Sequence, residues 1–525
     1  MILINETIGS YMDNIFEKFK EEEALVYVED NRRYTYKSLR EEVDIIAKSL
    51  ISIGIKKGDH VALLSCNSPE WIIVFLATLK IGAVLVCLNY SSTEAEIDYM
   101  LKQSDSTILI VSDKDMIEKV DLEKFDYLKV TVKMKTLFSL GIIMSQMKRV
   151  LNEELENVSK NVSPSDIATI IYTSGTTGTP KGAVFSHCAV LNGVLSFIKN
   201  FGYTSKDKIL VTLPLHHIMG GLYTAFLGLL AGSTVILMKK FKTYIALQTI
   251  ESEKCTGFHG VPTMYEYLLN KCEAYDLSSL RVGMIAGAVS SENFIKDIMK
   301  GLKINEISND FGQTETLGVT QTIIKDKDDP KINTVGKPVK HVLLKVCDLK
   351  TGDILSPNVE GEIYVKSPYC MIGYYNNSKA TESTVIGGWV HTGDIGYIDG
   401  DGYLYIKGRL KDVIIRGGEN ISPTDIEIHL NDHPEIENAV VVGVPDEVLG
   451  EEIFAFIKAK KLFKLTEKDI FDHLLGKISR YKFPKYIEFI DEFPLTSTGK
   501  IKRSSLREIA IDKIKLLELN EVAIS

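Results

Sequence analysis

The chain has 525 residues, which suggests roughly three or four domain-sized units, and its 45% hydrophobic and 25% charged residues are ordinary for a soluble globular protein. The 61 Lys and Arg and the 70 Asp and Glu residues give a net charge of −9, so the composition shows no basic footprint for nucleic acid. The 7 cysteines stand singly without a CxxC pair, which argues against a disulfide framework or a zinc site and favours a reducing cytoplasm.

No basic segment followed by an apolar core opens the chain, so we expect no signal peptide. Two apolar stretches, 72–88 and 222–238, are the candidates for membrane spans. The first contains Lys80 and Gly82 and is shorter than a span of about 20 residues, and the second is interrupted by Gly232. Each is better explained as a buried helix followed by a buried strand, at 83–88 and 234–238, and we expect no transmembrane segment.

From about Thr35 to Met238, helical patterns alternate with short apolar runs. This alternation predicts α/β units with largely parallel sheets and helices on both faces. In such sheets ligands bind at the carboxyl ends of the strands. The predicted strands lie at 61–64, 83–88, 107–111 and 209–212.

Another apolar run at 167–172 predicts a buried strand, and a further one follows at 183–185. Glycines let the loop between them approach a ligand closely, and successive backbone N–H groups form an anion-binding concavity, so the loop suits a polyphosphate. The Walker pattern fails, because Pro180 replaces its second glycine and Gly182 replaces its Ser or Thr. The loop residues concerned are Thr173, Ser174, Gly175, Thr176, Thr177, Gly178 and Lys181.

Past Gly336 the pattern changes to short strands, predicted at 343–346, 361–365, 393–398 and 403–407, with two Asp-Gly turns at 399–402 that indicate hairpins. A separate α+β unit follows, with a helix starting at Ser422 as its cap, strands at 439–444 and 453–458, and a helix starting at Thr466. We expect a domain boundary at 409–412, dividing the chain into 1–409 and 410–525.

Further short segments accompany the loop in a fixed order. They are Pro214-Leu215-His216-His217-Ile218-Met219-Gly220, Gly287-Ala288, Asp310-Phe311-Gly312-Gln313-Thr314-Glu315, Trp389-Val390-His391-Thr392-Gly393-Asp394, Gly408-Arg409 and Pro494-Leu495-Thr496-Ser497-Thr498-Gly499-Lys500-Ile501. Together they resemble the adenylate-forming superfamily of acyl-CoA synthetases, aryl-CoA ligases, luciferases and peptide-synthetase adenylation domains, over about 34–506. The resemblance implies a large N-terminal domain of two α/β subdomains plus a β-barrel-like subdomain, with a small mobile α+β C-terminal domain.

The resemblance also implies the ligands and the residues that hold them. The loop 173–181 would hold the β- and γ-phosphates of ATP. His217 would line the acyl site. Gly287 and Ala288 would pack against adenine, and Phe311, where Tyr is commoner, would stack on it within the motif of Gly312, Gln313 and Thr314. Glu315 would hold Mg²⁺, which usually takes one or two carboxylates. Asp394 and Arg409 would contact the ribose.

Two implied features concern movement of the small domain. Lys411 occupies the hinge position, where many relatives have Asp, and Lys500 is the implied catalytic lysine. Gly417 and Gly418 would line a channel for the pantetheine arm of CoA; alternatively they form a simple strand-to-helix turn that needs a positive φ angle.

The implied reaction is ATP-dependent ligation of a carboxylic acid to CoA, with release of AMP and pyrophosphate. Residues 213–238 contain no acidic side chain to pair with a substrate ammonium, so an uncharged, largely apolar acid is expected, either fatty or aryl. Its expected neighbours are His217, Met219, 259–262, 287–289 and 317–319. Two alternatives are an enzyme that delivers the acyl group to an acyl carrier protein and a non-catalytic adenylate-binding protein. Luciferase-type oxidation of the adenylate also stays open. The oligomeric state is not predicted.

Overall fold

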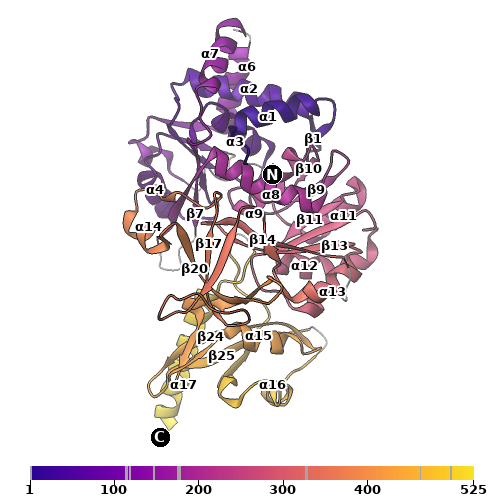
Figure 1. The fold of residues 1–525 in the computed structure, drawn as a ribbon, viewed down its shortest axis with the longest axis vertical. Coiled ribbons are helices and arrows are strands. Elements are labelled where there is room, and N and C mark those ends of the chain that lie inside the picture. The colour runs from indigo at the N-terminus through magenta and orange to yellow at the C-terminus, as the bar shows by residue number, and fades with distance from the viewer. Residues whose placement is uncertain are drawn as a thin grey trace.

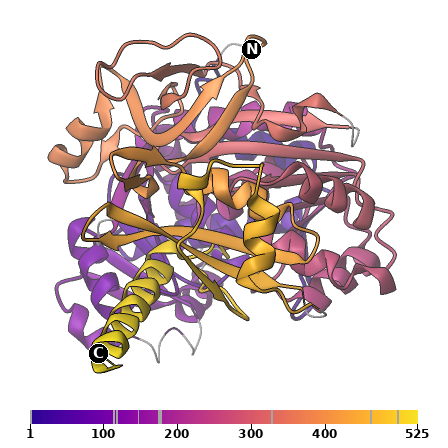
Figure 2. The same cartoon turned by 90° about the horizontal axis from the view of Figure 1, so that it is seen from below.

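The structure is a computed structural model that describes residues 3–112, 116, 120–145, 148–173, 179–325, 329–460, 463–496 and 499–524. The elements after residue 412 form a body at one end of the molecule, here called the small domain, and the rest is called the large domain (Figure 1). Seen from the small-domain end, the golden and yellow elements of the small domain lie in front of the large domain (Figure 2).

One sheet of the large domain carries the strand that precedes the glycine-rich loop. Its order is β18-β8-β7-β4-β3-β5-β6, parallel from β7 to β6 and antiparallel from β7 through β8 to β18. Strands β3, β4 and β5 are buried throughout, as expected of parallel strands covered on both faces. The bounds are β3 His60–Leu64, β4 Val84–Leu88, β5 Ile108–Val111, β6 Val130–Lys133, β7 Ile167–Thr173, β8 Lys181–Ser186 and β18 Gly373–Tyr374. The strands predicted at 61–64, 83–88, 107–111, 167–172 and 183–185 are confirmed to within one or two residues.

The second sheet has the order β15-β14-β13-β12-β11-β9-β10-β1-β2, with a parallel centre from β13 to β1 and antiparallel strands at its ends. Its strands are β1 Glu23–Tyr27, β2 Arg32–Thr35, β9 Lys208–Val211, β10 Thr234–Leu237, β11 Gly257–Gly260, β12 Val282–Ala286, β13 Glu306–Gln313, β14 Leu317–Ile324 and β15 Lys337–Pro338. The carboxyl ends of β12 and β13 lead into the segments 287–288 and 311–315.

The two apolar stretches considered as membrane spans are a helix and a strand each. Helix α3, Pro69–Lys80, is capped by Ser68 and leads into β4, while 222–238 contains α10, Leu227–Leu230, and β10. Part of the second helix, η2 at Gly221–Phe226, has π-type hydrogen bonding, which periodicity alone does not predict. Among the described residues, none of the helices combines the length and apolar composition needed to cross a bilayer.

The other helices of the large domain surround the two sheets, and α1, α2, α6 and α7 gather at the end far from the small domain (Figure 1). They are α1 Ile8–Lys18, α2 Tyr36–Ser52, α4 Glu94–Gln103, η1 Leu122–Phe125, α6 Met134–Ser145, α7 Lys148–Lys160, α8 His187–Phe201, α9 Ile218–Gly220, α11 Thr243–Glu253, α12 Pro262–Leu269, η3 Cys272–Ala274, α13 Glu292–Gly301, η4 Pro330–Asn333 and α14 Ser378–Thr384.

The predicted β-rich part is a further antiparallel sheet in the order β16-β17-β20-β19, with β21 also paired to β20. Its strands are β16 Leu343–Cys347, β17 Gly361–Lys366, β19 Val385–Ile386, β20 Trp389–Ile398 and β21 Leu404–Arg409. The two Asp-Gly turns fall in the one connection between β20 and β21, so they make a single hairpin. A single 3-10 turn, η5 Leu410–Asp412, leads from β21 to the small domain.

The small domain has a sheet in the order β23-β22-β25-β24, with β26 beside β25, and its own apolar clusters. Its elements are β22 Ile414–Arg416, β23 Glu419–Ile421, α15 Pro423–Asn431, β24 Ile436–Asp446, β25 Gly450–Ala459, α16 Glu467–Leu474, η6 Arg480–Lys482, β26 Tyr486–Phe489 and α17 Arg503–Ile524. Thr466 and Asp469 form the expected capping box of α16. Ser422 is the N-cap residue of α15 and Pro423 its first residue, as predicted, but the Ser422 hydroxyl makes no capping hydrogen bond and donates to the Lys407 carbonyl at 2.6 Å.

Candidate active site

The glycine-rich loop starts and ends on paired strands, because Thr173 faces Lys181 in the register of β7 and β8. This places Lys181 at the carboxyl end of β7, where ligands of parallel sheets bind. The Nζ of Lys181 lies 5.3 Å from the centroid of the Tyr374 ring. The rest of the predicted phosphate loop lies outside the described residues: Ser174, Gly175, Thr176, Thr177 and Gly178.

Tyr374 connects Lys181 to the predicted metal ligand, Glu315. The Tyr374 hydroxyl donates to Glu315 Oε1 at 2.7 Å, and the Glu315 carbonyl accepts from the Met371 backbone N–H at 2.8 Å. Burial and the neighbouring Glu315 carboxylate raise the pKa of the Tyr374 phenol, so it remains a hydrogen-bond donor at neutral pH. Strand β18 brings Tyr374 here by pairing with β8, where Tyr374 lies opposite Ala183.

A buried carboxylate, Asp394, lies between Gln313 and Arg409. Gln313 Nε2 donates to the Thr392 carbonyl at 2.9 Å and also to the Asp394 carboxylate. Arg409 lies opposite Asp394 in the β20–β21 register, and its Nε is 2.9 Å from Asp394 Oδ1. Burial raises the pKa of Asp394 to about 6, although Arg409 and the Gln313 hydrogen bond oppose this. Asp394 is therefore largely ionised at neutral pH.

Lys500 reaches the large domain from a tight turn of the small domain. The Thr496 N–H donates to the Lys500 carbonyl at 2.7 Å, and Gly499 takes a φ of +80° that favours glycine. A β-carbon at Gly287, whose φ is +93°, would lie 2.6 Å from Lys500 Cε and 2.9 Å from its Nζ. The Lys500 side chain thus occupies the space that Gly287 leaves open.

The charge of Lys500 is set by its surroundings. Burial lowers the pKa of Lys500 to about 8, and the Arg409 guanidinium acts in the same direction, while Asp394 opposes it. Lys500 is therefore an ammonium at pH 7 that loses its proton as the pH rises through about 8. Lys500, Arg409 and Asp394 form one interacting group of charges, which joins residues of both domains.

The two adjacent histidines, His216 and His217, have different surroundings in the structure. His217 precedes α9, its Nδ1 accepts from the Met219 N–H at 3.3 Å, and burial, Lys500 and His216 lower its pKa to about 3. His216 packs edge-on against Tyr90 at 5.3 Å, and its Nδ1 has no hydrogen-bond partner among the described residues. Of the pair, it is His217 that lies near Lys500, and it is neutral.

The predicted adenine-side residues follow two neighbouring parallel strands, since Gly287 and Ala288 come after β12 and Phe311 lies near the end of β13. The register shifts between Phe311 and Gly312, and a β-carbon at Gly312 would lie 2.3 Å from the Leu317 carbonyl oxygen, so only glycine fits there. Thr314 and Glu315 form the turn into β14.

Two other expectations are corrected. Gly417 and Gly418 are exposed and join two strands, β22 and β23, so the alternative of a strand-to-helix turn is wrong. The positive φ angles expected for them are confirmed, at +60° and +89°. His259, expected beside the acyl group, is fully buried and bonded to the Tyr203 hydroxyl at 2.9 Å and the Tyr223 carbonyl at 3.0 Å. It is a core histidine, because β11 is covered on both faces.

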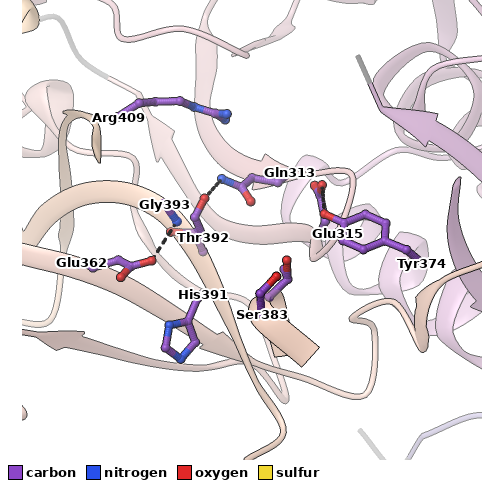
Figure 3. Close-up of a pocket in the computed structure, with 10 residues that line it drawn as sticks. Gln313, Glu315, Glu362, Tyr374, Ser383, His391, Thr392, Gly393 and Arg409 are labelled. Carbon is purple, nitrogen blue, oxygen red and sulfur yellow. Dashed lines mark hydrogen bonds between the residues drawn. The ribbon is translucent and has the colours of Figure 1, made fainter. Parts of the chain in front are cut away.

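A cavity of about 380 Å³ opens beside Glu315 and Arg409 (Figure 3). The residues lining it are Gln313, Glu315, Glu362, Tyr374, Ser383, Thr384, His391, Thr392, Gly393 and Arg409. Sequence reasoning missed Tyr374, whose hydroxyl donates to Glu315, and Glu362, which accepts from the Gly393 N–H (Figure 3). Among the described residues no three His, Cys, Asp or Glu side chains gather as a metal site. One carboxylate beside an open polar cavity fits Mg²⁺, which completes its shell with phosphate oxygens and water.

Comparison with known proteins gives consistent results. The AMP-binding enzyme family model matches residues 13–375, and the AMP-binding enzyme C-terminal domain model matches 425–500. The chain is 35% identical to the "Putative acyl-CoA synthetase YngI" of Bacillus subtilis, over 98% of this chain and 99% of that protein. It is 33% identical to the mouse medium-chain acyl-CoA ligase ACSF2, over 98% of this chain and 89% of ACSF2.

The similarity extends to solved structures. MatB from Rhodopseudomonas palustris is 26% identical, with 96% of this chain and 99% of MatB covered. The TM-score is 0.83 against the ATP-bound crystal structure of MatB and 0.75 against the apo crystal structure.

Proposed function

Because the chain belongs to the AMP-binding enzyme family and is an AMP-forming acyl-CoA synthetase, we propose that it activates a largely apolar carboxylic acid, fatty or aryl, and transfers the acyl group to CoA. The observation that carries this proposal is the insertion of Lys500 of the small domain against Gly287 of the large domain, beside Asp394.

In the first step, a carboxylate oxygen attacks the α-phosphorus of ATP, and the bond from that phosphorus to the pyrophosphate oxygen breaks. Both reactants are anionic, so their approach depends on positioned cations. Lys500 supplies one, since its ammonium is buried and charged at neutral pH. Lys181 supplies another at the carboxyl end of β7, on the side of the leaving pyrophosphate. Glu315, oriented by Tyr374, would hold Mg²⁺, which neutralises phosphate charge when bound.

We assign binding of the nucleoside part of ATP to residues of β20 and β21. Asp394 retains carboxylate oxygens that can accept two ribose hydroxyls, and such charge-assisted bonds are stronger than neutral ones. Gln313 and Arg409 fix the orientation of Asp394, because each contacts its carboxylate. Phe311 and the Gly287–Ala288 turn would contact the adenine. His217, neutral and near Lys500, would lie beside the acyl group.

In the second step, the CoA thiol attacks the acyl carbon and AMP leaves. We assign the pivot to Lys411 in the exposed single turn η5, at the proposed boundary 409–412. The better agreement with ATP-bound than with apo MatB supports this structure as the adenylation arrangement. Rotation about η5 would withdraw Lys500 and bring the exposed Gly417–Gly418 turn towards the site as the pantetheine channel.

The substrate class rests on the apolar segment 213–238, which has no carboxylate to pair with an ammonium, and on the similarity to a medium-chain acyl-CoA ligase. Asp310, on strand β13, is a poor source of that charge, because burial raises its pKa well above the usual range. The seven free thiols support a cytoplasmic setting.

The test is acid-dependent ATP–pyrophosphate exchange with aliphatic acids of increasing length, aryl acids, dicarboxylic acids and amino acids, followed by AMP formation with CoA or a holo-acyl carrier protein. We expect exchange with uncharged apolar acids and AMP formation with CoA. Exchange restricted to amino acids would refute the substrate class, and AMP formation only with the carrier protein would refute CoA as acceptor.

A further inference from the structure

The segment that carries Lys500 is closed by hydrogen bonds of its own; residues 495–496 and 499–501 are here called the Lys500 turn. Leu495 and Ile501 form an antiparallel bridge, and the Lys500 N–H donates to the Thr496 hydroxyl at 3.1 Å. These bonds lie within the small domain. They fix the shape of the turn, whereas its position against the large domain depends on contacts between the two domains.

The start of helix α12 in the large domain contacts the Lys500 turn directly. The Thr263 hydroxyl donates to the Gly499 carbonyl at 2.7 Å. A β-carbon at Gly499 would lie 3.3 Å from Val261 Cγ2 and 3.7 Å from Met264 Cε, so the turn also packs against apolar side chains here. Gly499 directly precedes Lys500 in the chain. The Thr263 hydrogen bond therefore fixes the backbone from which the Lys500 side chain extends.

The place of Thr263 in α12 explains why its hydroxyl can reach the other domain. Thr263 is the second residue of the helix, after Pro262. A threonine further inside a helix commonly donates to the carbonyl four residues earlier. Here that residue is His259, which belongs to strand β11, so the helix supplies no such acceptor. The branched β-carbon restricts χ1, so little side-chain freedom is lost when the bond to Gly499 forms.

We propose that Thr263 is a positioning residue for Lys500: its hydroxyl holds the Lys500 turn against the large domain during adenylation and releases it when the small domain rotates. Rotation carries Gly499 away from α12 together with Lys500, so the bond contributes to the first half-reaction alone. This inference rests on the proposed function, because it assigns the docked arrangement to adenylation. Thr263 acts through the backbone of the turn and needs no contact with any substrate.

The experiment compares wild type, Thr263→Val, Thr263→Ser and the control Thr107→Val. Valine keeps the shape of threonine without the hydroxyl, and serine keeps the hydroxyl. Thr107 is a matched control, because its half-buried hydroxyl also donates to a backbone carbonyl, that of His60 at 3.0 Å, but within the large domain. Three rates are measured for each protein: single-turnover adenylation, thioester formation from supplied acyl-adenylate, and chemical acetylation of Lys500 in the presence of Mg²⁺ and ATP, followed by mass spectrometry.

Loss of one neutral hydrogen bond should slow adenylation in Thr263→Val by about 3–10-fold and speed the acetylation of Lys500 by a similar factor. Thioester formation should proceed at the wild-type rate. The effect stays modest because other contacts between the domains remain, such as Asn293 with Asp432 at 3.3 Å and Lys407 with Asp425 at 3.5 Å. Thr263→Ser and the control variant should behave as wild type in all three measurements.

Adenylation by Thr263→Val at the wild-type rate would overturn the proposal. Equal losses in both half-reactions, or a serine variant as slow as the valine variant, would also overturn it, since either result shows that the hydroxyl does not act on Lys500. If valine prevents folding, Thr263→Ala, with a better helix former, gives the same comparison. Because acetylation needs no catalysis, absence of acid-dependent exchange in wild type would refute the proposed function, whereas unchanged acetylation of Lys500 in Thr263→Val would refute the role of Thr263.

Discussion

Replacing Gly287 by Ala tests the contact between Gly287 of the large domain and Lys500 of the small domain. The added β-carbon would lie 2.6 Å from Lys500 Cε, whereas carbon atoms in favourable contact are about 3.5–4.0 Å apart. The end of the lysine must therefore retreat by about 1 Å, a displacement that can cost about 10²-fold in rate. Because a lysine end moves more easily than backbone, the penalty falls mainly on adenylation. The positive φ adds about 1–2 kcal/mol of backbone strain, which lowers the free energy of unfolding.

The assay is a double-mutant cycle in the single-turnover adenylation reaction. Gly287→Ala should lower the rate by about 10–10²-fold, and Lys500→Ala by about 10²–10³-fold, the scale for losing one preorganised stabiliser. The double variant should resemble Lys500→Ala, because the alanine methyl group then has nothing to displace. If the two losses multiply instead, Gly287 acts independently of Lys500 and the reasoning is refuted.

Two other predictions address the metal and the thiol. Tyr374→Phe removes the hydrogen-bond donor to Glu315 and should raise about 10-fold the Mg²⁺ concentration required for ATP–pyrophosphate exchange and for thermal stabilisation by ATP. The control Tyr375→Phe, which removes a hydroxyl bonded to Asp105, should leave that concentration unchanged. An unchanged Mg²⁺ requirement in Tyr374→Phe would contradict the role of Tyr374. Gly418→Trp should spare adenylation and block thioester formation, because an added β-carbon at Gly418 has no atom within 4 Å and the ring would enter the proposed channel. Gly352→Trp is the control for backbone strain at a positive φ angle. If both steps survive in Gly418→Trp, the channel is excluded.

Several buried parallel strands could be predicted, because strands buried on both faces appear in the sequence as continuous apolar runs, whereas β1, β6, β11, β12 and β13 were not predicted. Those predicted at 61–64, 107–111 and 167–172 correspond to β3, β5 and β7. The segment 287–288 and Lys500 were predicted to share one nucleotide by resemblance, and the structure places them in contact.

Other features depend on pairings that no local pattern encodes. Tyr374 reaches Glu315 only because β18 adds to the edge of β8, and Gly287 meets Lys500 only when the two domains dock. Ser422 is the N-cap residue as predicted, but its hydroxyl bonds the Lys407 carbonyl of another strand and makes no capping hydrogen bond. In each case the decisive partner is distant in sequence, so composition and periodicity carry no signal of it.

The most direct test of the central claim measures the two half-reactions separately in Lys500→Ala. The account predicts that adenylation falls by about 10²–10³-fold, while thioester formation from supplied acyl-adenylate and CoA stays within a few-fold of wild type. Equal losses in both half-reactions would show that Lys500 does not act specifically in activating the acid, and would contradict the account.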